Sequence, residues 1–235
     1  MKEENGSTAP GILPVLRSKE EAKRFYDRIS KVYDYFTGAF ERRYAEMAVE
    51  RLSVEEGETV LEIGFGPGHC LKRLAESVGK TGKAYGVDIS SGMLEVTRRR
   101  LTKAQLMDRV ELYCGDAATL PYGDNTFDAA FMSFTLELFD TLEIQKVLEQ
   151  IKRVLKSEGR LVVVSMSKEN GESIFLRLYE WMHNKWPKYV DCRPIYVEQS
   201  LREAGYTVKS KEKVRLFRLP VEIVVAVNTI SGNIV

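Results

Sequence analysis

The stretch VLEIGFGPGH, residues 60–69, constrains the fold of this chain more than any other feature. Its first four residues are apolar apart from Glu62, a pattern that predicts a strand buried in a parallel sheet. Glycines follow at alternate positions, Gly64, Gly66 and Gly68, where they permit a left-handed backbone and the close approach of a ligand. The next residues predict a helix, whose first N–H groups are unpaired and lie at the positive end of its dipole. The stretch therefore predicts a cradle for a small molecule, with Glu62 as a buried acid that needs a partner.

Strand and helix patterns alternate from residue 59 onward, which predicts a doubly wound α/β domain with right-handed crossovers and a mostly parallel sheet. The connection between the last two strands is short, so these strands should pair antiparallel at the sheet edge. The predicted strands are 59–63, 84–87, 110–114, 127–133, 160–166, 207–213 and 221–227. The predicted helices among them are 69–78, 91–106, 142–155 and 197–204.

The residues before the first strand form a separate N-terminal addition. Residues 1–17 are polar and then contain glycine and proline, so we expect them to form a flexible arm. Ser18 and Glu21 form a capping-box signature, which predicts a helix over residues 19–35. A second helix is expected over residues 40–51.

We interpret residues 18–56 as a helical lid, residues 57–235 as the sheet domain, and residues 168–194 as a helical insertion within that domain. The inserted helix should end at Trp186, which precedes a proline. The apolar residues that recur at helical spacing along the first lid helix are Phe25, Ile29, Val32, Tyr33 and Phe36.

Composition excludes several classes of protein. Lys and Arg number 35 against 34 Asp and Glu, a balance that does not indicate a nucleic-acid surface. The three cysteines, Cys70, Cys114 and Cys192, are too widely spaced for a disulfide framework or a zinc site, so we expect no metal. No apolar run has the length of a signal peptide or a membrane span. We therefore expect a cytoplasmic protein, with peripheral membrane contact and oligomeric state left open.

Acidic residues follow three successive predicted strands or lie at their ends. Glu62 can pair with an ammonium group, and Asp88 can accept hydrogen bonds from both hydroxyls of a ribose. Asp116, followed by Ala117, can receive the exocyclic amine of adenine. Ligands of open α/β sheets bind outside the carboxyl ends of the strands, where these groups should meet. An ammonium, a ribose and an adenine together indicate S-adenosylmethionine.

Two other classes use a related fold. A nicotinamide-dependent oxidoreductase would need a third fingerprint glycine where His69 stands, and it has no use for Glu62. The chain also has no Tyr-x-x-x-Lys pair after the fourth predicted strand. A non-catalytic S-adenosylmethionine-binding module is the other alternative.

The segments LEIGFGPGH, GVDISSGML, GDAATLPYGDNTFDAAFMSF and RVLKSEGRLVVV resemble the motifs of class I S-adenosylmethionine-dependent methyltransferases. The similarity is greatest to the branch of ubiquinone and menaquinone biosynthesis, and it covers about residues 26–226. It implies a seven-stranded sheet with the last strand antiparallel, and an N-terminal lid around Tyr26 and Tyr33. The cofactor-binding residues that it implies are Tyr26, Tyr33, Glu62, Gly64, Gly66, Gly68, Asp88, Ile89, Met93, Asp116, Ala117 and Ser133.

The acceptor of the methyl group is less well defined. The apolar lid favours a small hydrophobic or amphiphilic acceptor, and a quinone ring, a phospholipid amine and a small thiol are all open. Quinone methyltransferases typically continue the fourth strand into Phe-Gly-Leu-Arg-Asn, whereas this chain reads Phe-Thr-Leu-Glu-Leu from residue 134. An acceptor that must lose a proton needs a base, for which the candidates are His183, Glu137 and Tyr33.

Overall fold

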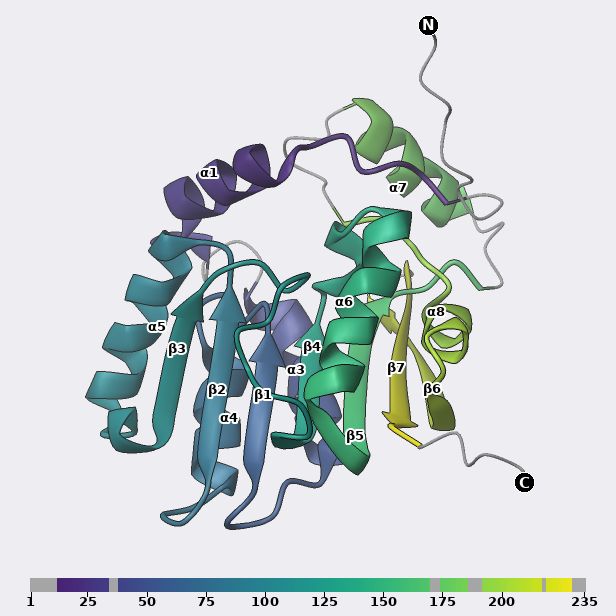
Figure 1. Ribbon diagram of the computed structural model, residues 1–235. Helices are drawn as coiled ribbons and strands as arrows, with labels where there is room; N and C mark the ends of the chain where they lie inside the picture. The colour runs from purple at the N-terminus through teal and green to yellow at the C-terminus, as the bar shows by residue number, and fades with distance from the viewer. Residues whose placement is uncertain (1–11, 34–37, 170–173, 186–191, 217–218, 230–235) are drawn as a thin grey trace, which may run out of the picture.

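A single seven-stranded sheet forms the centre of the computed structural model, with strands in the order β3-β2-β1-β4-β5-β7-β6 (Figure 1). The structure describes residues 12–33, 38–169, 174–185, 192–216 and 219–229. The strands are β1 Thr59–Ile63, β2 Lys83–Asp88, β3 Val110–Cys114, β4 Phe127–Ser133, β5 Leu155–Met166, β6 Thr207–Leu216 and β7 Leu219–Val227.

The sheet is parallel from β3 to β5 and antiparallel around β7. The strand β1 pairs in parallel with both β2 and β4, whereas β7 runs antiparallel to both β5 and β6. The predicted doubly wound α/β fold, with its last strand antiparallel, is therefore confirmed. The strand order changes direction beside β1, which places a crevice at the carboxyl ends of β1 and β4.

Helices cover both faces of the sheet because β1 is apolar on both sides. Leu61 and Ile63 pack into the core beneath α6 and α8, and Val60 packs into the core beneath α3, α4 and α5. The helices of the structure are α1 Lys19–Ile29, α3 Gly38–Leu52, α4 His69–Ser77, α5 Ser91–Lys103, α6 Thr141–Val154, α7 Ile174–Lys185 and α8 Val197–Glu203, with 3-10 turns η1 Met107–Arg109 and η2 Leu136–Leu138.

Two element boundaries differ from the predictions by about five residues or more, and the others by fewer. The first helix ends at Ile29 instead of residue 35, and residues 30–32 form a turn, while Phe36 lies outside the described residues. The strand β5 begins at Leu155, five residues before the predicted Arg160, because Leu155 already pairs with Phe127. The register then shifts near Glu158, whose φ is +60°, an irregularity that the apolar pattern did not reveal.

Residues 12–17 are a packed segment, which corrects the prediction of a flexible arm for this part of the chain. Ile12 belongs to the core and is 9% exposed. The carbonyl of Leu13 accepts a hydrogen bond of 2.7 Å from the buried Arg193. We call residues 12–17 the N-terminal strap; residues 1–11 lie outside the described residues.

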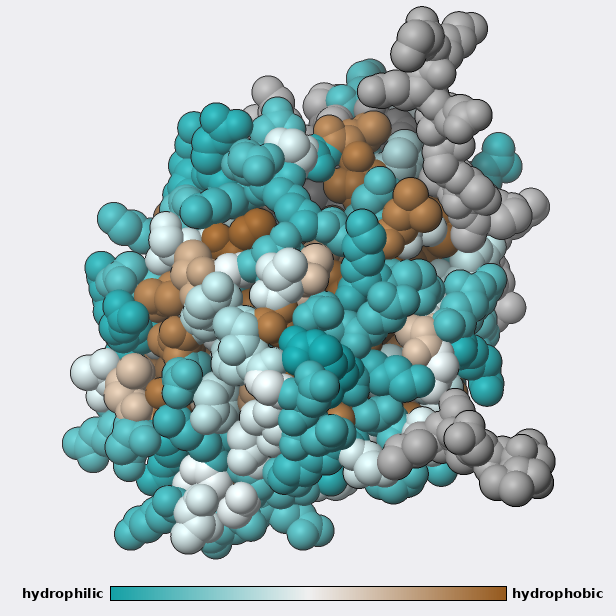
Figure 2. Space-filling model, in the orientation of Figure 1, coloured by the Kyte–Doolittle hydropathy of each residue, from teal (hydrophilic) through white to brown (hydrophobic). Residues whose placement is uncertain are grey.

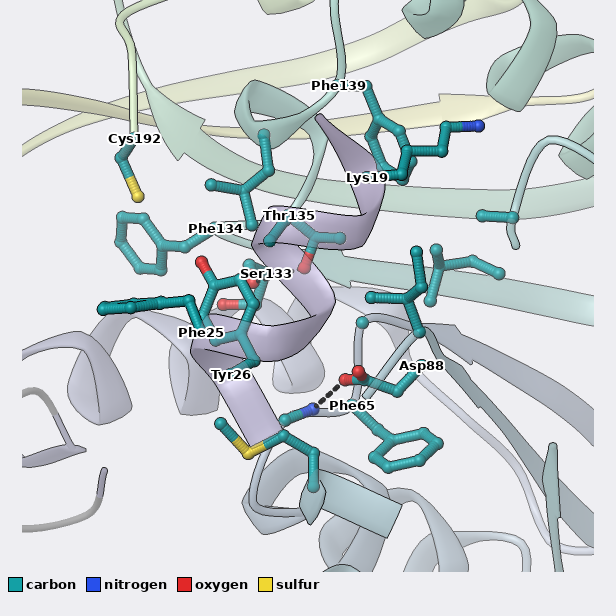
Figure 3. Close-up of a pocket in the computed structure, with 18 of the residues that line it drawn as sticks. Lys19, Phe25, Tyr26, Phe65, Asp88, Ser133, Phe134, Thr135, Phe139 and Cys192 are labelled. Atoms are coloured by element: carbon teal, nitrogen blue, oxygen red, sulfur yellow. Dashed lines mark hydrogen bonds between the residues drawn. The ribbon is translucent and has the colours of Figure 1, made fainter. Parts of the chain in front are cut away.

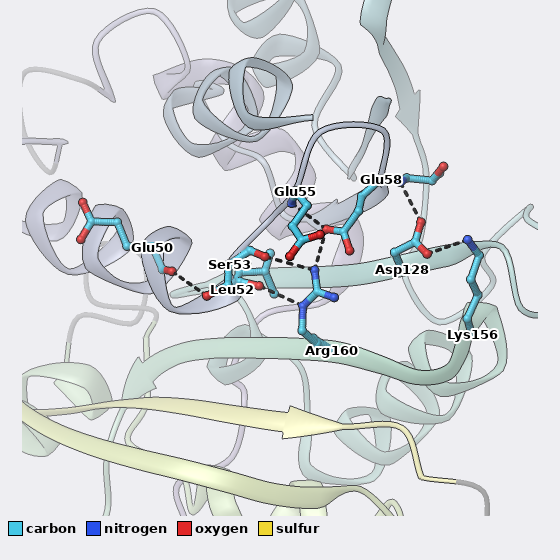
Figure 4. Close-up of polar contacts among 9 residues, drawn as sticks. Glu50, Leu52, Ser53, Glu55, Glu58, Asp128, Lys156 and Arg160 are labelled. Carbon is cyan, nitrogen blue, oxygen red and sulfur yellow. Dashed lines mark hydrogen bonds and ion pairs between the residues drawn. The ribbon is translucent and has the colours of Figure 1, made fainter. Parts of the chain in front are cut away.

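Polar contacts fix the amino ends of the strands, opposite the crevice (Figure 4). Asp128 accepts hydrogen bonds from Thr59 N–H at 2.9 Å and from Lys156 Nζ at 2.6 Å. Arg160 donates to Leu52 O and pairs with Glu58 at 2.6 Å, which joins α3 to the sheet. These contacts join β1, β4, β5 and α3 at the end of the sheet that is remote from the crevice.

The face in Figure 2 is mostly polar, with apolar side chains in separate patches, one near α7 and another on the side of α5 and β3. The large exposed apolar residues include Leu16, Val32 and Trp181. Within the described residues, none of the helices has the length and apolar character needed to cross a bilayer.

Candidate active site

A cavity of about 530 Å³ lies at the carboxyl ends of β1, β2, β3 and β4. Helix α1 crosses over it, and α7 lies at the same end of the sheet (Figures 1 and 3). Asp88 and Phe65 lie on one side of the cavity in Figure 3, and Phe134 and Cys192 lie on the other. The cavity is therefore continuous between two regions of different composition.

The glycine turn forms the floor on the side of Asp88. Gly64, Gly66 and Gly68 have φ values of +71°, +49° and +79°, a left-handed conformation that favours glycine. A Cβ on Gly64 would lie 2.3 Å from Thr135 Oγ1, so this glycine is required by packing. A Cβ on Gly66 would meet nothing within 4 Å. The space above Gly66 is therefore open to a ligand.

Glu62 supplies a buried carboxylate to this part of the wall. Glu62 is 2% exposed, and its Oε2 has no hydrogen-bond partner among the described residues. Burial, together with the nearby charge of Asp88, raises the pKa of Glu62 well above its usual range. A cationic ligand group would satisfy the carboxylate and restore its ionised form.

Asp88 is oriented by the turn and by the start of α5. It accepts hydrogen bonds from Gly66 N–H at 2.8 Å and from Ser90 N–H at 2.9 Å, one at each carboxylate oxygen. Burial raises its pKa to about 6 despite these two donors. Each oxygen retains accepting capacity, so the carboxylate can receive the two hydroxyls of a ribose.

Asp116 makes a contact that the sequence did not predict. One of its oxygens accepts from Ala118 N–H at 2.9 Å, and the other pairs with Lys19 Nζ at 2.5 Å. Lys19 also pairs with Glu143, at the start of α6. The first residue of α1 is thereby tied to the end of the cavity where adenine is expected.

Helix α1 is held over the site by Asp27. Its Oδ1 accepts from Ser90 Oγ at 2.7 Å and from Gly92 N–H at 2.8 Å, at the amino end of α5. Burial opposes ionisation, but these donors lower the pKa of Asp27 below its usual value. The sequence places Asp27 beside Tyr26 in the expected lid but indicates no role for it, since nothing near it in the chain points to α5.

The other part of the wall is aromatic. Phe134 follows β4 with a φ of +49°, which is rare for an aromatic residue and marks a strained position. Tyr179 lies on α7, and its hydroxyl donates to Cys192 O at 3.0 Å. His183 is one turn further along α7 and is 2% exposed. We call the part of the cavity that these residues and Cys192 line the aromatic compartment.

The structure brings nearly all predicted site residues together. Of the cofactor candidates, Gly68 does not line the cavity; its place is fixed by Thr97, 2.5 Å from where a Cβ would stand. Of the base candidates, His183 and Tyr33 line the cavity. Glu137 is not part of the wall: it is fully buried and accepts from Met166 N–H at 3.3 Å. The cofactor candidates in the wall are Tyr26, Tyr33, Glu62, Gly64, Gly66, Asp88, Ile89, Met93, Asp116, Ala117 and Ser133.

The residues present fit S-adenosylmethionine. The partnerless oxygen of Glu62 suits its ammonium group, the open space above Gly66 admits its chain, and Asp88 suits its ribose. The three cysteines are free thiols, and the described residues hold no group of three His, Cys, Asp or Glu side chains that could bind a metal.

Comparison with known proteins agrees with this fit. Residues 60–159 match the model of a methyltransferase domain family. The chain is 32% identical to a demethylmenaquinone methyltransferase of Symbiobacterium thermophilum, with 88% of each chain covered. It is 28% identical to a 2-phytyl-1,4-naphthoquinone methyltransferase of Trichormus variabilis, covering 91% of this chain and 92% of the relative.

Two solved structures show the same fold. The cyclase SpnF superposes with a TM-score of 0.75 at 20% identity, covering 93% of this chain and 99% of SpnF. A SAM-dependent methyltransferase from Aquifex aeolicus superposes with a TM-score of 0.60 at 24% identity, covering 91% of this chain and all (100%) of that one. Because a cyclase shares the architecture, the fold alone does not fix the reaction.

Proposed function

Because the chain belongs to the class I S-adenosylmethionine-dependent methyltransferases, we propose that it methylates a ring carbon of a reduced naphthoquinone-type acceptor. The observation that carries this proposal is the continuity of the cavity from Glu62 and Asp88 to the aromatic compartment around Phe134 and Tyr179. The names of the two relatives supply the ring class.

The acceptor should react as the hydroquinone. S-adenosylmethionine supplies an electrophilic methyl group on a sulfonium, and an oxidised quinone ring is too poor in electrons to attack it. Loss of a hydroxyl proton from the hydroquinone makes the adjacent ring carbon nucleophilic. That carbon forms the new C–CH₃ bond while the S–CH₃ bond breaks, and the ring C–H proton is then lost to restore aromaticity.

The chain itself contributes position and exclusion of water. The strand ends hold the donor through Glu62, Asp88 and Asp116, and α1 closes over it through Phe25 and Tyr26. The aromatic compartment would hold a flat ring against the donor, and such alignment lowers the barrier by removing the entropy cost of bringing the reactants together. In this proposal α1 and α7 act as the lid; contact with a membrane surface and a cytoplasmic location stay predictions.

The departure from the quinone-family sequence after β4 is the main reason to test other acceptors. Glu137 and Leu138 stand where that family has Arg-Asn, and Glu137 is turned into the core. The assay should therefore compare a 2-prenyl-1,4-naphthohydroquinone without a 3-methyl group, its oxidised form, vesicles of phosphatidylethanolamine, and 2-mercaptoethanol.

We expect S-adenosylhomocysteine and a methylated naphthohydroquinone, both detected by mass spectrometry, in the reduced sample alone. Turnover of the amine or the thiol with no methylated ring would refute the proposed acceptor. The Asp88→Ala variant serves as the control for methylation that does not depend on the bound donor.

A further inference from the structure

The strongest unassigned feature is the surroundings of His183 in the aromatic compartment. Its imidazole is 2% exposed, and Nδ1 has no hydrogen-bond partner among the described residues. The other ring nitrogen, Nε2, lies 3.5 Å from the carbonyl oxygen of Pro14 in the N-terminal strap. A carbonyl oxygen only accepts, so a hydrogen bond between these two atoms needs a proton on Nε2.

Arg193 fixes the strap that carries this carbonyl. It is fully buried, and its Nη1 donates to Leu13 O at 2.7 Å and to Thr141 Oγ1 at 3.1 Å. Its Nη2 donates to Phe139 O. One side chain thus joins the strap, the end of η2 and the start of α6. Leu13 is the neighbour of Pro14, so Arg193 sets the place of the carbonyl that faces His183.

We infer that His183 is the general base of this enzyme, with its proton held on Nε2 by Pro14 O and its Nδ1 left to accept the hydroxyl proton of the acceptor. An imidazole protonated at Nε2 is a base at Nδ1, and a neighbouring group that fixes the tautomer raises the fraction of molecules ready to react. Arg193 is a positioning residue in this arrangement.

The other groups of the cavity wall are less suited to the task. The carboxylates of Glu62, Asp88 and Asp116 belong to the donor side of the cavity, and Glu137 lies outside its wall. The other acids and the second histidine of the wall have other positions: His69 begins α4 beside the glycine turn, Asp140 caps α6, and Glu143 pairs with Lys19. Tyr33 lines the cavity, but a phenol is a weak proton acceptor near neutral pH. The inference rests on the proposed function only for the nature of the acceptor; the tautomer is a property of the protein alone.

The tautomer can be measured directly, since the chain contains two histidines. We would label the full chain with ¹⁵N-histidine and record two-bond ¹⁵N–¹H correlations at pH 8, using a His69→Gln variant to assign the signals. We expect Nε2 of His183 to be the protonated nitrogen and Nδ1 to be unprotonated. A ring protonated at Nδ1 would overturn the inference, whatever the acceptor.

Steady-state kinetics with the naphthohydroquinone as acceptor are the second test of the role of His183. His183→Asn should lower kcat by about 10²- to 10⁴-fold, the usual contribution of a general base, with the Kd for S-adenosylhomocysteine within about twofold of wild type. Added imidazole should restore part of kcat in His183→Gly. A His183→Asn enzyme with unchanged kcat would refute the role.

A third variant tests the positioning role. Arg193→Lys loses the two-armed contact, so we expect a mixed tautomer at His183 and a lower kcat at unchanged cofactor affinity. Thr141→Val removes one acceptor of Arg193 and serves if Arg193→Lys does not fold. If the hydroquinone is not methylated while His183 has the expected tautomer, the proposed acceptor fails and the base assignment stands.

Discussion

The two halves of the cavity are built in different ways. The donor half, around Glu62, Gly66, Asp88 and Asp116, consists of strand ends and one turn, whose places follow from the sheet. The acceptor half, around Phe134, Tyr179, His183 and Cys192, is assembled from three separate segments: the end of β4, helix α7 and the stretch that begins at Cys192. A half built from sheet geometry binds one fixed ligand, whereas a half built from insertions can change its acceptor without disturbing the fold. Variants can test whether a change in one half alters binding of the donor or of the acceptor alone.

The largest effect is expected in the donor half. Asp88→Ala removes the acceptor for two ribose hydroxyls, at about 1.5–3 kcal/mol for each charge-assisted hydrogen bond. We therefore expect the affinity for S-adenosylhomocysteine to fall at least about 100-fold in calorimetry. Asp128→Ala is the matched control, because Asp128 also binds a backbone N–H but lies at the opposite end of the sheet. Equal losses in the two variants would mean that Asp88 acts through stability alone.

Substitutions in the acceptor half should change the KM for the acceptor. Tyr179→Ala removes an aromatic ring from the wall and the hydrogen bond to Cys192 O, so the KM for the acceptor should rise about 10- to 30-fold. The Kd for S-adenosylhomocysteine should stay within about twofold. Trp181→Ala, two residues along α7 at a position that is 50% exposed, should leave both constants unchanged. A large change in cofactor affinity in Tyr179→Ala would show that the halves are not separable.

Glu62→Gln should separate binding from stability. The pKa of Glu62 is raised by burial, so its ionisation costs the empty protein stability, and this cost grows as the pH rises from the ordinary carboxyl pKa to the raised one. At pH 8 the glutamine variant should unfold about 2–4 °C higher, the shift expected for ~1 kcal/mol, and this advantage should shrink at low pH. Cofactor affinity should fall about tenfold with the loss of one ion pair. A less stable variant at pH 8 would contradict this account.

Cofactor affinity should also depend on pH. The pKa of Asp88 is raised to about 6, and only its carboxylate form accepts from both ribose hydroxyls. Binding should therefore weaken as the pH falls through 6, by about tenfold between pH 7 and pH 5. The dependence should persist in Glu62→Gln, which isolates the contribution of Asp88. Affinity that is constant down to pH 5 would exclude this titration.

The smallest effect is expected at the lid, which covers both halves. Asp27→Ala removes the contacts to Ser90 and Gly92, comparable to the loss of a helix cap at about 1 kcal/mol. Dissociation of S-adenosylhomocysteine, followed by stopped-flow fluorescence, should become about three- to fivefold faster. Glu20→Ala, on the exposed side of the same helix, should not change it. An unchanged rate in Asp27→Ala would mean that α1 does not limit release.

The sequence alone determined the donor half and most of the sheet. The bounds of β1, β3 and β4 are as predicted, because buried strands next to glycines and acids have a strong local pattern. The meeting of Glu62, Asp88 and Asp116 at one cavity was predictable for the same reason: strand ends in a parallel sheet meet at one edge, so their positions in the chain imply their positions in space.

Only the tertiary structure revealed the contacts that hold helix α1 and the N-terminal strap against the cavity. Lys19 pairs with Asp116, Asp27 reaches the start of α5, and Arg193 holds the strap opposite His183, each across a long separation in the chain. Local periodicity carries no information about such contacts, because they depend on how packed segments meet and not on the spacing of residues along one segment. The local pattern of the sequence therefore predicts the site for the methyl donor. The surroundings of the acceptor depend on how distant segments of the chain fold onto one another.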